Sequence, residues 1–134
     1  MGEFRIIEND RFIYYGEVRK DDHSKILGKG IKVIKANGEL FEGWHKNENN
    51  VTGKGRWIGG RAKKIYVGDL VDNKSEGLGE LRMASGDRYK GSFVNDRYEG
   101  FGTYYRVDRR YREGIYVQSK IQGEGKICFP DGSF

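Results

Sequence analysis

The chain has 134 residues, 21 of them glycine, and a formal net charge of +5 at pH 7. Its length suits one structural unit, and no apolar run is long enough to predict a transmembrane helix or a secretory signal. Because Cys128 is the only cysteine, an internal disulfide is excluded and a reducing compartment is favoured. We therefore expect a cytoplasmic protein.

A phrase of about 23 residues recurs along the chain. Each copy has an aromatic residue, a glycine two places later, a Gly-x-Gly and a turn, and the clearest copies begin at Tyr66 and Tyr89. In chain order we expect a single repeat domain over 1–134, with a partial leading copy followed by full copies. The partial copy spans 1–13, and the full copies span 14–40, 41–65, 66–88, 89–111 and 112–134.

Within each copy the pattern has period two, which is typical of β-strands. In the copy 66–88, for example, Tyr66, Gly68 and Leu70 share one face of a strand, and a turn follows at 72–75. No stretch shows the sustained i, i+3, i+4, i+7 apolar pattern of a helix. The sequence therefore predicts an all-β fold, an elongated single-layer antiparallel meander of about five consecutive β-hairpins.

The phased glycines predict a furrow in the sheet, because two residues without side chains leave room for aromatic rings from neighbouring strands. Internal packing explains most of these aromatics. A one-layer sheet, however, does not cover both of its faces, so part of the furrow should stay open to a helix or extended peptide of a partner protein. The candidate groove residues are Tyr14, Phe41, Trp57, Tyr66, Tyr89, Phe93, Tyr104 and Tyr116.

Basic residues gather in the turns between copies, which a stacked meander places along one long edge. They either keep an extended sheet soluble or attract an anionic membrane surface. Nucleic acid is a poorer fit, because the aromatics that would stack on its bases are needed for internal packing. The candidate basic edge comprises Arg61, Lys63, Lys64, Arg88, Arg106, Arg109, Arg110 and Arg112.

No catalytic or metal-binding constellation is recognisable. His23 and His45 share no metal-type spacing with each other or with Cys128, so all three are interpreted as surface or packing residues. A phosphate loop is excluded because every Gly-x-Gly leads into a strand rather than a helix. We expect no enzymatic activity, no cofactor and no metal.

The repeated phrase resembles the MORN repeat (membrane occupation and recognition nexus). The resemblance is carried by Tyr66-Val67-Gly68 with Gly77-Leu78-Gly79, by Tyr89-Lys90-Gly91 with Gly100-Phe101-Gly102, and by the closing Phe129-Pro130-Asp131-Gly132. It covers about nine tenths of the chain. Three positions depart from the pattern: Arg112 replaces the aromatic, His45 stands where an aromatic is expected, and Asp108-Arg109 replaces the turn glycine.

The resemblance implies scaffolding or partner recognition, because members of this family occur in ciliary and cytoskeletal scaffolds, junctional membrane proteins, phosphatidylinositol phosphate kinases and a histone lysine methyltransferase. The first expectation is a scaffold that binds a protein segment along the groove in a cytoskeletal or ciliary assembly. The alternatives are a peripheral adaptor for anionic phospholipids or phosphoinositides, and a regulatory domain of a multidomain enzyme. Both ends look cut, which suggests a fragment of a longer array, and strand edges there favour a homodimer or end-to-end association.

Overall fold

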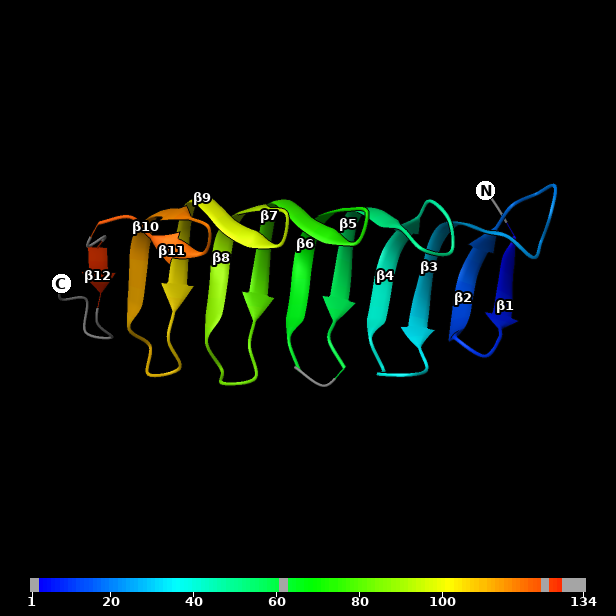
Figure 1. Ribbon diagram of the computed structural model, residues 1–134, viewed down its shortest axis with the longest axis horizontal. Coiled ribbons are helices and arrows are strands. Elements are labelled where there is room, and N and C mark those ends of the chain that lie inside the picture. Colours follow the sequence, from blue (N-terminus) through cyan, green and yellow to red (C-terminus); the bar gives the residue numbers. More distant parts are fainter. Residues whose placement is uncertain (1–2, 61–62, 124–125, 129–134) are drawn as a thin grey trace.

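The computed structural model describes residues 3–60, 63–123 and 126–128. Its strands form one sheet in which β1 to β11 follow one another in chain order and β12 pairs with β10 (Figure 1). All the pairings are antiparallel, so the expected all-β, antiparallel meander is confirmed. The described part of the chain contains no helix suited to crossing a membrane. The strands are β1 (Phe4–Glu8), β2 (Phe12–Val18), β3 (Ile26–Ile34), β4 (Leu40–His45), β5 (Val51–Ile58), β6 (Ile65–Val71), β7 (Lys74–Arg82), β8 (Arg88–Val94), β9 (Arg97–Tyr105), β10 (Tyr111–Val117), β11 (Lys120–Ile121) and β12 (Lys126–Cys128).

The phased glycines make room for tyrosine rings, as the sequence predicts. A Cβ atom added at Gly79 would lie 2.3 Å from the hydroxyl of Tyr66, and one added at Gly102 would lie 2.1 Å from the hydroxyl of Tyr89. Such distances are far below van der Waals contact, so only glycine fits beneath each ring. The same relation holds between Gly30 and Tyr14.

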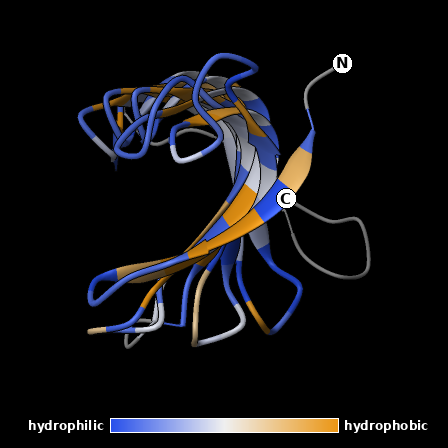
Figure 2. Cartoon of the chain, turned by 90° about the vertical axis from the view of Figure 1, so that its right-hand side faces the viewer, coloured by the Kyte–Doolittle hydropathy of each residue, from blue (hydrophilic) through white to orange (hydrophobic). Residues whose placement is uncertain are grey.

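A bulge at the same place in four hairpins bends the sheet into a trough. The strand register shifts between Gly16 and Val18, and equivalent shifts recur at 42–44, 68–70 and 91–93. Bulges bend and twist a strand locally. Because all four bend the same way, the ribbon has a C-shaped cross-section when viewed along its long axis (Figure 2).

Tyrosine hydroxyls satisfy carbonyl groups at three of these bulges. Tyr14 donates to the carbonyl of Glu17 at 2.6 Å, Tyr66 to that of Asp69 at 2.6 Å, and Tyr89 to the carbonyl three residues later at 3.1 Å. The ring that fills the furrow therefore also holds the bend, so one residue type has two structural roles in each of these copies.

The buried side chains form two clusters instead of one continuous ladder. In the copy that starts at Phe41, a Cβ added at Gly55 would meet Leu70 at 3.0 Å and one added at Gly43 would meet Val51 at 3.1 Å, so aliphatic groups replace the tyrosine there. The break falls between β3 and β5. One cluster contains Phe12, Tyr14, Val18 and Ile26, and the other contains Val51, Tyr66, Leu70, Tyr89, Phe93 and Tyr116.

The hairpin turns are fastened to one another across neighbouring copies. Asp96 donates its backbone N–H to the carbonyl of Ser75 at 3.1 Å, and its carboxylate accepts from the backbone N–H of Ser75 at 2.7 Å. Asn73 makes the same reciprocal pair with Val51, and Ser119 makes it with Tyr98. This row of turns forms one rim of the trough, which we call the hairpin-turn lip. The opposite rim consists of the turns that join successive copies and is called the junction lip.

Candidate binding groove

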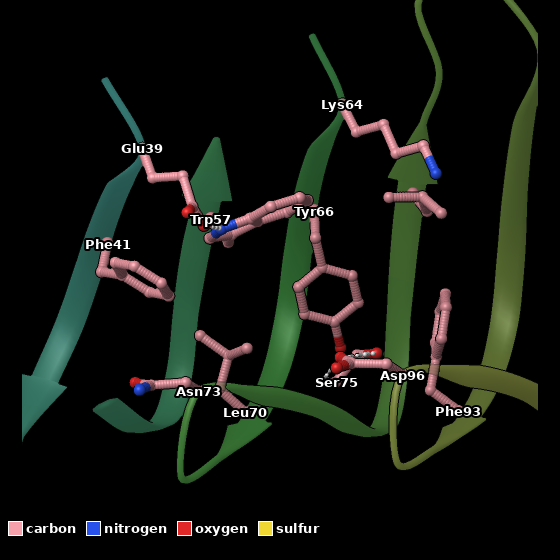
Figure 3. A pocket seen from close by; sticks show the side chains of 11 residues that line it. Glu39, Phe41, Trp57, Lys64, Tyr66, Leu70, Asn73, Ser75, Phe93 and Asp96 are labelled. Carbon is pink, nitrogen blue, oxygen red and sulfur yellow. Dashed lines mark hydrogen bonds between the residues drawn. The ribbon is translucent and has the colours of Figure 1, made fainter. Parts of the chain in front are cut away.

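The inner side of the trough contains an open cavity of about 340 Å³ over β4 to β8 (Figure 3). Phe41, Trp57 and Leu81 contribute half-buried apolar surface, while Asn73 and Asp96 of the hairpin-turn lip close the other side. The cavity therefore has an apolar floor and polar sides, which is the usual composition of a recognition site. The described residues that line it are Glu39, Phe41, Trp57, Lys64, Tyr66, Leu70, Asn73, Ser75, Leu81, Phe93 and Asp96.

Hydrogen bonds fix the aromatic floor of this first cavity. The indole N–H of Trp57 donates to the carboxylate of Glu39 at 2.9 Å, and that carboxylate also accepts from the side-chain amide of Asn37 at 2.6 Å. Beneath the floor, Phe93 contacts the ring of Tyr66 edge to face at 5.1 Å. The floor is thus held in place before any partner arrives, which lowers the entropic cost of binding.

A second cavity of about 370 Å³ lies farther along the trough, over β9 to β11, and it is basic. Arg106, Arg110 and Arg112 line it together with Tyr104. The Tyr104 hydroxyl donates to Asp87 at 2.9 Å, and burial raises the pKa of this phenol to about 12. The remaining lining residues are Tyr111, Tyr116 and Ile121. Four strand-to-strand steps, roughly 19 Å, separate β10 from β6 in the first cavity.

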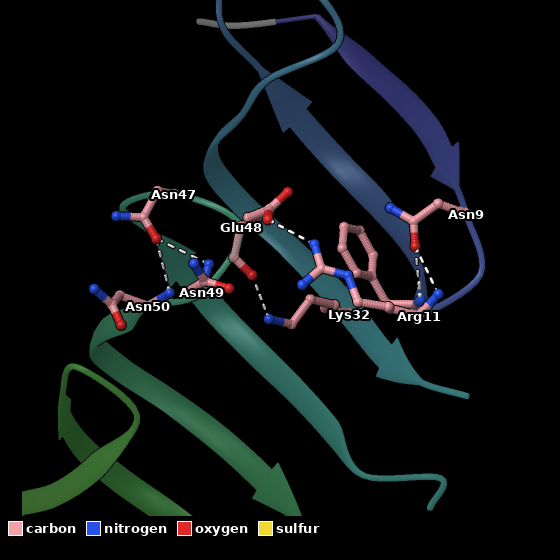
Figure 4. A network of polar contacts seen from close by, with 8 residues as sticks. Asn9, Arg11, Lys32, Asn47, Glu48, Asn49 and Asn50 are labelled. Atoms are coloured by element: carbon pink, nitrogen blue, oxygen red, sulfur yellow. Dashed lines mark hydrogen bonds and ion pairs between the residues drawn. The ribbon is translucent and has the colours of Figure 1, made fainter. Parts of the chain in front are cut away.

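At the β2–β4 end the trough is lined by charged side chains that bind one another beside an open hollow (Figure 4). The buried ammonium of Lys32 lies 5.6 Å from the ring of Phe12 and 5.5 Å from that of Phe41, and it donates to the backbone carbonyl of Glu48. Burial lowers the pKa of Lys32. Arg11 binds the Glu48 carboxylate at 2.8 Å. Lys32 occupies the strand position that Trp57 and Tyr104 hold in other copies. A search for phased aromatic residues alone does not find this lysine.

His45 is a buried packing residue beside this network. Its ring meets Tyr14 edge to face at 5.1 Å, and its Nδ1–H donates to the carbonyl of Gly43 at 3.2 Å. The other nitrogen, Nε2, has no hydrogen-bond partner among the described residues, and burial lowers the pKa of the imidazole to about 4. At neutral pH the ring is therefore uncharged, in keeping with its apolar surroundings.

The predicted groove residues lie at two depths. Phe41, Trp57 and Tyr104 are half-buried and line cavities, whereas Tyr66, Phe93 and Tyr116 are almost fully buried in the floor. Tyr14 and Tyr89 have no exposed surface, and burial raises the pKa of each phenol to about 12. These two residues support the trough from within and present nothing to a partner in this conformation.

The described members of the predicted basic edge lie in or directly beside the turns of the junction lip, but their side chains have different surroundings. Lys64 lines the first cavity and Arg106, Arg110 and Arg112 line the second, while Arg88 lies over the ring of Tyr105 at 4.3 Å. Asp108 pairs with Arg110 at 2.6 Å and lies 4.0 Å from Arg106. Lys63 and Arg109 are exposed on the junction lip. Arg61 falls outside the described residues, as do the side chains of Ile127 and Cys128.

The described residues contain no cluster of histidine, cysteine and carboxylate groups able to hold a metal ion. Acidic side chains near basic partners have lowered pKa values: hydrogen bonding to Lys54 lowers the pKa of Asp69, and hydrogen bonding to Arg110 lowers that of Asp108. Both carboxyls are thus ionised at neutral pH and do not resemble the neutral carboxyl that general acid catalysis requires.

Comparison with known families agrees with this architecture. The model of the MORN repeat matches three consecutive segments, residues 66–88, 89–109 and 113–134. No curated protein is a match for the chain. MORN repeats are a non-catalytic repeat type that generally mediates binding to proteins or membranes. With its phased glycines, its successive hairpins and these three matches, the chain belongs to the MORN-repeat family.

Proposed function

We propose that the chain is a non-catalytic scaffold whose trough binds a segment of another protein. The observation that carries this proposal is the first cavity, where Phe41, Trp57 and Leu81 leave apolar surface half open on a floor held by hydrogen bonds. Apolar surface that remains open in a concave site favours a partner with complementary apolar side chains.

The shape of the trough favours a rod-like occupant over a small ligand. The two cavities are spaced along the long axis of the ribbon, and both lips rise beside that axis (Figures 1 and 2). A helix or an extended peptide could reach both cavities at once, whereas a small molecule would fill only one. We place this activity in the cytoplasm, in a cytoskeletal or ciliary assembly, on the strength of the family resemblance.

The proposal is tested by affinity capture from cell extract with mass spectrometry. The groove variant is Trp57→Ala with Phe41→Ala, since both side chains are half open, whereas Phe93 and Tyr116 belong to the buried core and their loss would destabilise the fold. The matched control is Phe101→Ala, which removes an exposed aromatic from the outer face. Circular dichroism checks that each variant is folded.

Capture of a protein by the wild type and the Phe101 control, but not by the groove variant, is the expected result. Equal capture by all three proteins would refute binding in the groove. Because the floor residues are preorganised, we expect a partner's affinity to fall at least about tenfold when the indole and the phenyl ring are removed.

Attachment to an anionic membrane is a second candidate function. Lys63, Lys64 and Arg109 are exposed and make no ion pair with any carboxylate of the described chain. Uncompensated bases of this kind attract anionic lipid at about 1 kcal/mol each. Sedimentation with phosphatidylserine vesicles tests this candidate, and binding that survives Lys63→Glu with Lys64→Glu would exclude it. A regulatory role within a larger enzyme is compatible with either surface.

A further inference from the structure

We propose that the partner segment is acidic where it crosses β9 and β10, and that its carboxylates bind Arg112 and Arg106 in the second cavity. The inference rests on the proposed function, since it assumes that a protein segment occupies the trough. It specifies the chemistry and the placement of that segment: acidic side chains over the second cavity and apolar side chains over the first.

Arg112 is the residue that carries the proposal. It stands in the row of furrow positions that Tyr14, Phe41, Tyr66 and Tyr89 fill in the preceding copies. Its side chain is half-buried in the lining of the second cavity and makes no ion pair with a carboxylate of the described chain. A half-buried arginine without a carboxylate partner among the described residues is stabilised by an incoming anion.

Its neighbours add positive charge that is only partly compensated. Arg106 lies 4.0 Å from Asp108, while the same carboxylate binds Arg110 tightly, with contacts of 2.6 and 2.9 Å. One carboxylate thus serves two guanidinium groups, and Asp87, another acid near the cavity, accepts from Tyr104 at 2.9 Å and from the backbone N–H of Val107 at 2.9 Å. Among the residues that the structure describes, the lining of the second cavity therefore keeps a net positive charge.

The first cavity differs in chemistry from the second, so the two halves of the trough favour different groups on a partner. Its charged lining residues are Glu39, Asp96 and Lys64, set around an aromatic and aliphatic floor. A segment that places apolar groups there and acidic groups roughly 19 Å away matches both cavities. That distance corresponds to about six residues of extended chain or about thirteen residues of helix.

The geometry favours a peptide over a membrane as the source of the anion. The ribbon is C-shaped in cross-section, and its two lips project beyond the floor (Figure 2). The residues that line both cavities belong to the inner side of this trough. A flat bilayer meets the rims of such a surface, whereas a single chain segment can enter between them. Binding of a lipid phosphate headgroup in the second cavity is therefore the alternative that the test below distinguishes.

The test is selection of peptides from a random 16-residue display library on the intact chain, followed by affinity measurement with the enriched peptides. The variants are Arg112→Gln, Arg106→Gln and the single substitution Trp57→Ala in the first cavity. The matched control is Lys90→Gln, which removes an exposed base from a strand without touching either cavity. Phosphatidylserine vesicles form a parallel arm, with the best peptide as competitor.

Enriched peptides should combine an acidic cluster with aromatic or aliphatic residues. Arg112→Gln should weaken their binding at least about tenfold, with a reduced salt dependence, while Lys90→Gln leaves it unchanged. Peptides that need Trp57 but are indifferent to Arg112 and Arg106 would overturn this inference and leave the proposed function standing. Peptides whose binding is also unaffected by Trp57→Ala would refute both this inference and the proposed function. Vesicle binding that no peptide displaces would show that the second cavity binds lipid instead.

Discussion

Single glycines set how closely the tyrosine rings approach the sheet. Gly102 illustrates this, because the ring above it belongs to Tyr89, which is stacked on Tyr98 at 3.9 Å and meets Phe93 and Tyr116 edge to face. A ring enclosed on three sides cannot move aside for a methyl group. The repeat's glycines therefore act through packing as much as through backbone freedom.

Gly102→Ala should lower the free energy of unfolding by about 3 kcal/mol, since its Cβ would overlap the Tyr89 phenol. Urea denaturation followed by tryptophan fluorescence measures this loss. Gly38→Ala is the control for backbone strain alone, because Gly38 has φ +75° and open space around its Cβ, and it should cost about 1 kcal/mol. Equal costs at the two sites would contradict the packing argument.

His45 should make stability depend on pH below neutrality. Burial lowers its folded-state pKa to about 4, so the unfolded chain binds a proton first as the pH falls through 6.5. The neutral ring contributes to the free energy of unfolding above pH 6.5. This contribution, up to about 3 kcal/mol, is lost progressively towards pH 4. The nearby ammonium of Lys32 acts in the same direction.

His45→Phe should flatten this pH dependence, because phenylalanine cannot take up the proton and the equivalent position of the later copy is Phe93. Urea midpoints of both proteins at several pH values between 4 and 7 provide the comparison, and subtracting one profile from the other removes the carboxylates common to both. Parallel profiles would show that the imidazole does not titrate in this range.

Whole elements are joined by the turns of the hairpin-turn lip. In each two-residue turn both central residues have positive φ, as at Asn95 with 52° and Asp96 with 67°. Such turns usually contain glycine. Here the second residue bears a side chain that hydrogen-bonds to the preceding copy. This contact between repeats offsets the backbone strain.

Asp96→Ala should therefore cost about 2 kcal/mol, because it removes the acceptor for the backbone N–H and the hydroxyl of Ser75 and keeps the strain. Asp96→Gly should cost less, since glycine relieves the strain. Thermal unfolding ranks the variants. Asp72→Ala is the control, as that carboxylate has only a 3.4 Å contact with Lys46, and a loss as large as that of Asp96→Ala would argue against the inter-repeat contact.

On the junction lip a residue with positive φ has no compensating side-chain contact among the described residues. Arg109 has φ +75°, while Gly86 occupies the equivalent position with φ +95°. The exposed Arg109 side chain makes no ion pair within the described chain, so Arg109→Gly should raise stability by about 0.5–1 kcal/mol. Arg106→Gly, at a residue without positive φ, should lower it. A fall in the urea midpoint for Arg109→Gly would refute the strain argument.

The sequence predicted those parts of the structure that depend on period and residue size. Alternation of residue type indicated the strands, and the small size of Gly79 and Gly102 indicated the rings of Tyr66 and Tyr89 above them. The curl of the trough was not predictable in this way, because each register shift sets three residues opposite one, and two extra residues leave the alternation between the faces unchanged.

The depth of the candidate groove was equally hidden from the sequence. Tyr89 and Trp57 are both phased aromatics, yet the first is fully buried and the second half open. The difference depends on which neighbours cover each ring, and the neighbours come from strands before and after it. Lys32 shows the same limit, since its burial requires the loop that carries Glu48.

Across the whole molecule, two buried clusters share one sheet. The cluster around Tyr14 and Val18 is separated from the larger one by the copy that starts at Phe41. In that copy Val51 and Leu70, instead of an aromatic ring, lie against the furrow glycines. Repeat arrays are stabilised mainly by contacts between neighbours. The two clusters should therefore open with different free energies.

Val18→Ala should test this separation by amide hydrogen exchange. Losing buried surface at Val18 should speed exchange in β1 to β3 while leaving β7 to β9 unchanged. Leu70→Ala in the larger cluster should give the converse pattern. A uniform increase across all strands for either variant would mean that the sheet unfolds as one unit.

The direction of the strands has a mechanical consequence. Every strand runs across the long axis of the ribbon, so the hydrogen bonds that join neighbouring strands point along that axis (Figure 1). Tension applied between the two ends would pull each bond lengthwise and peel strands away in succession, instead of shearing many bonds together. Under load such a ribbon would yield gradually and lengthen, and each hairpin that re-formed would shorten it again.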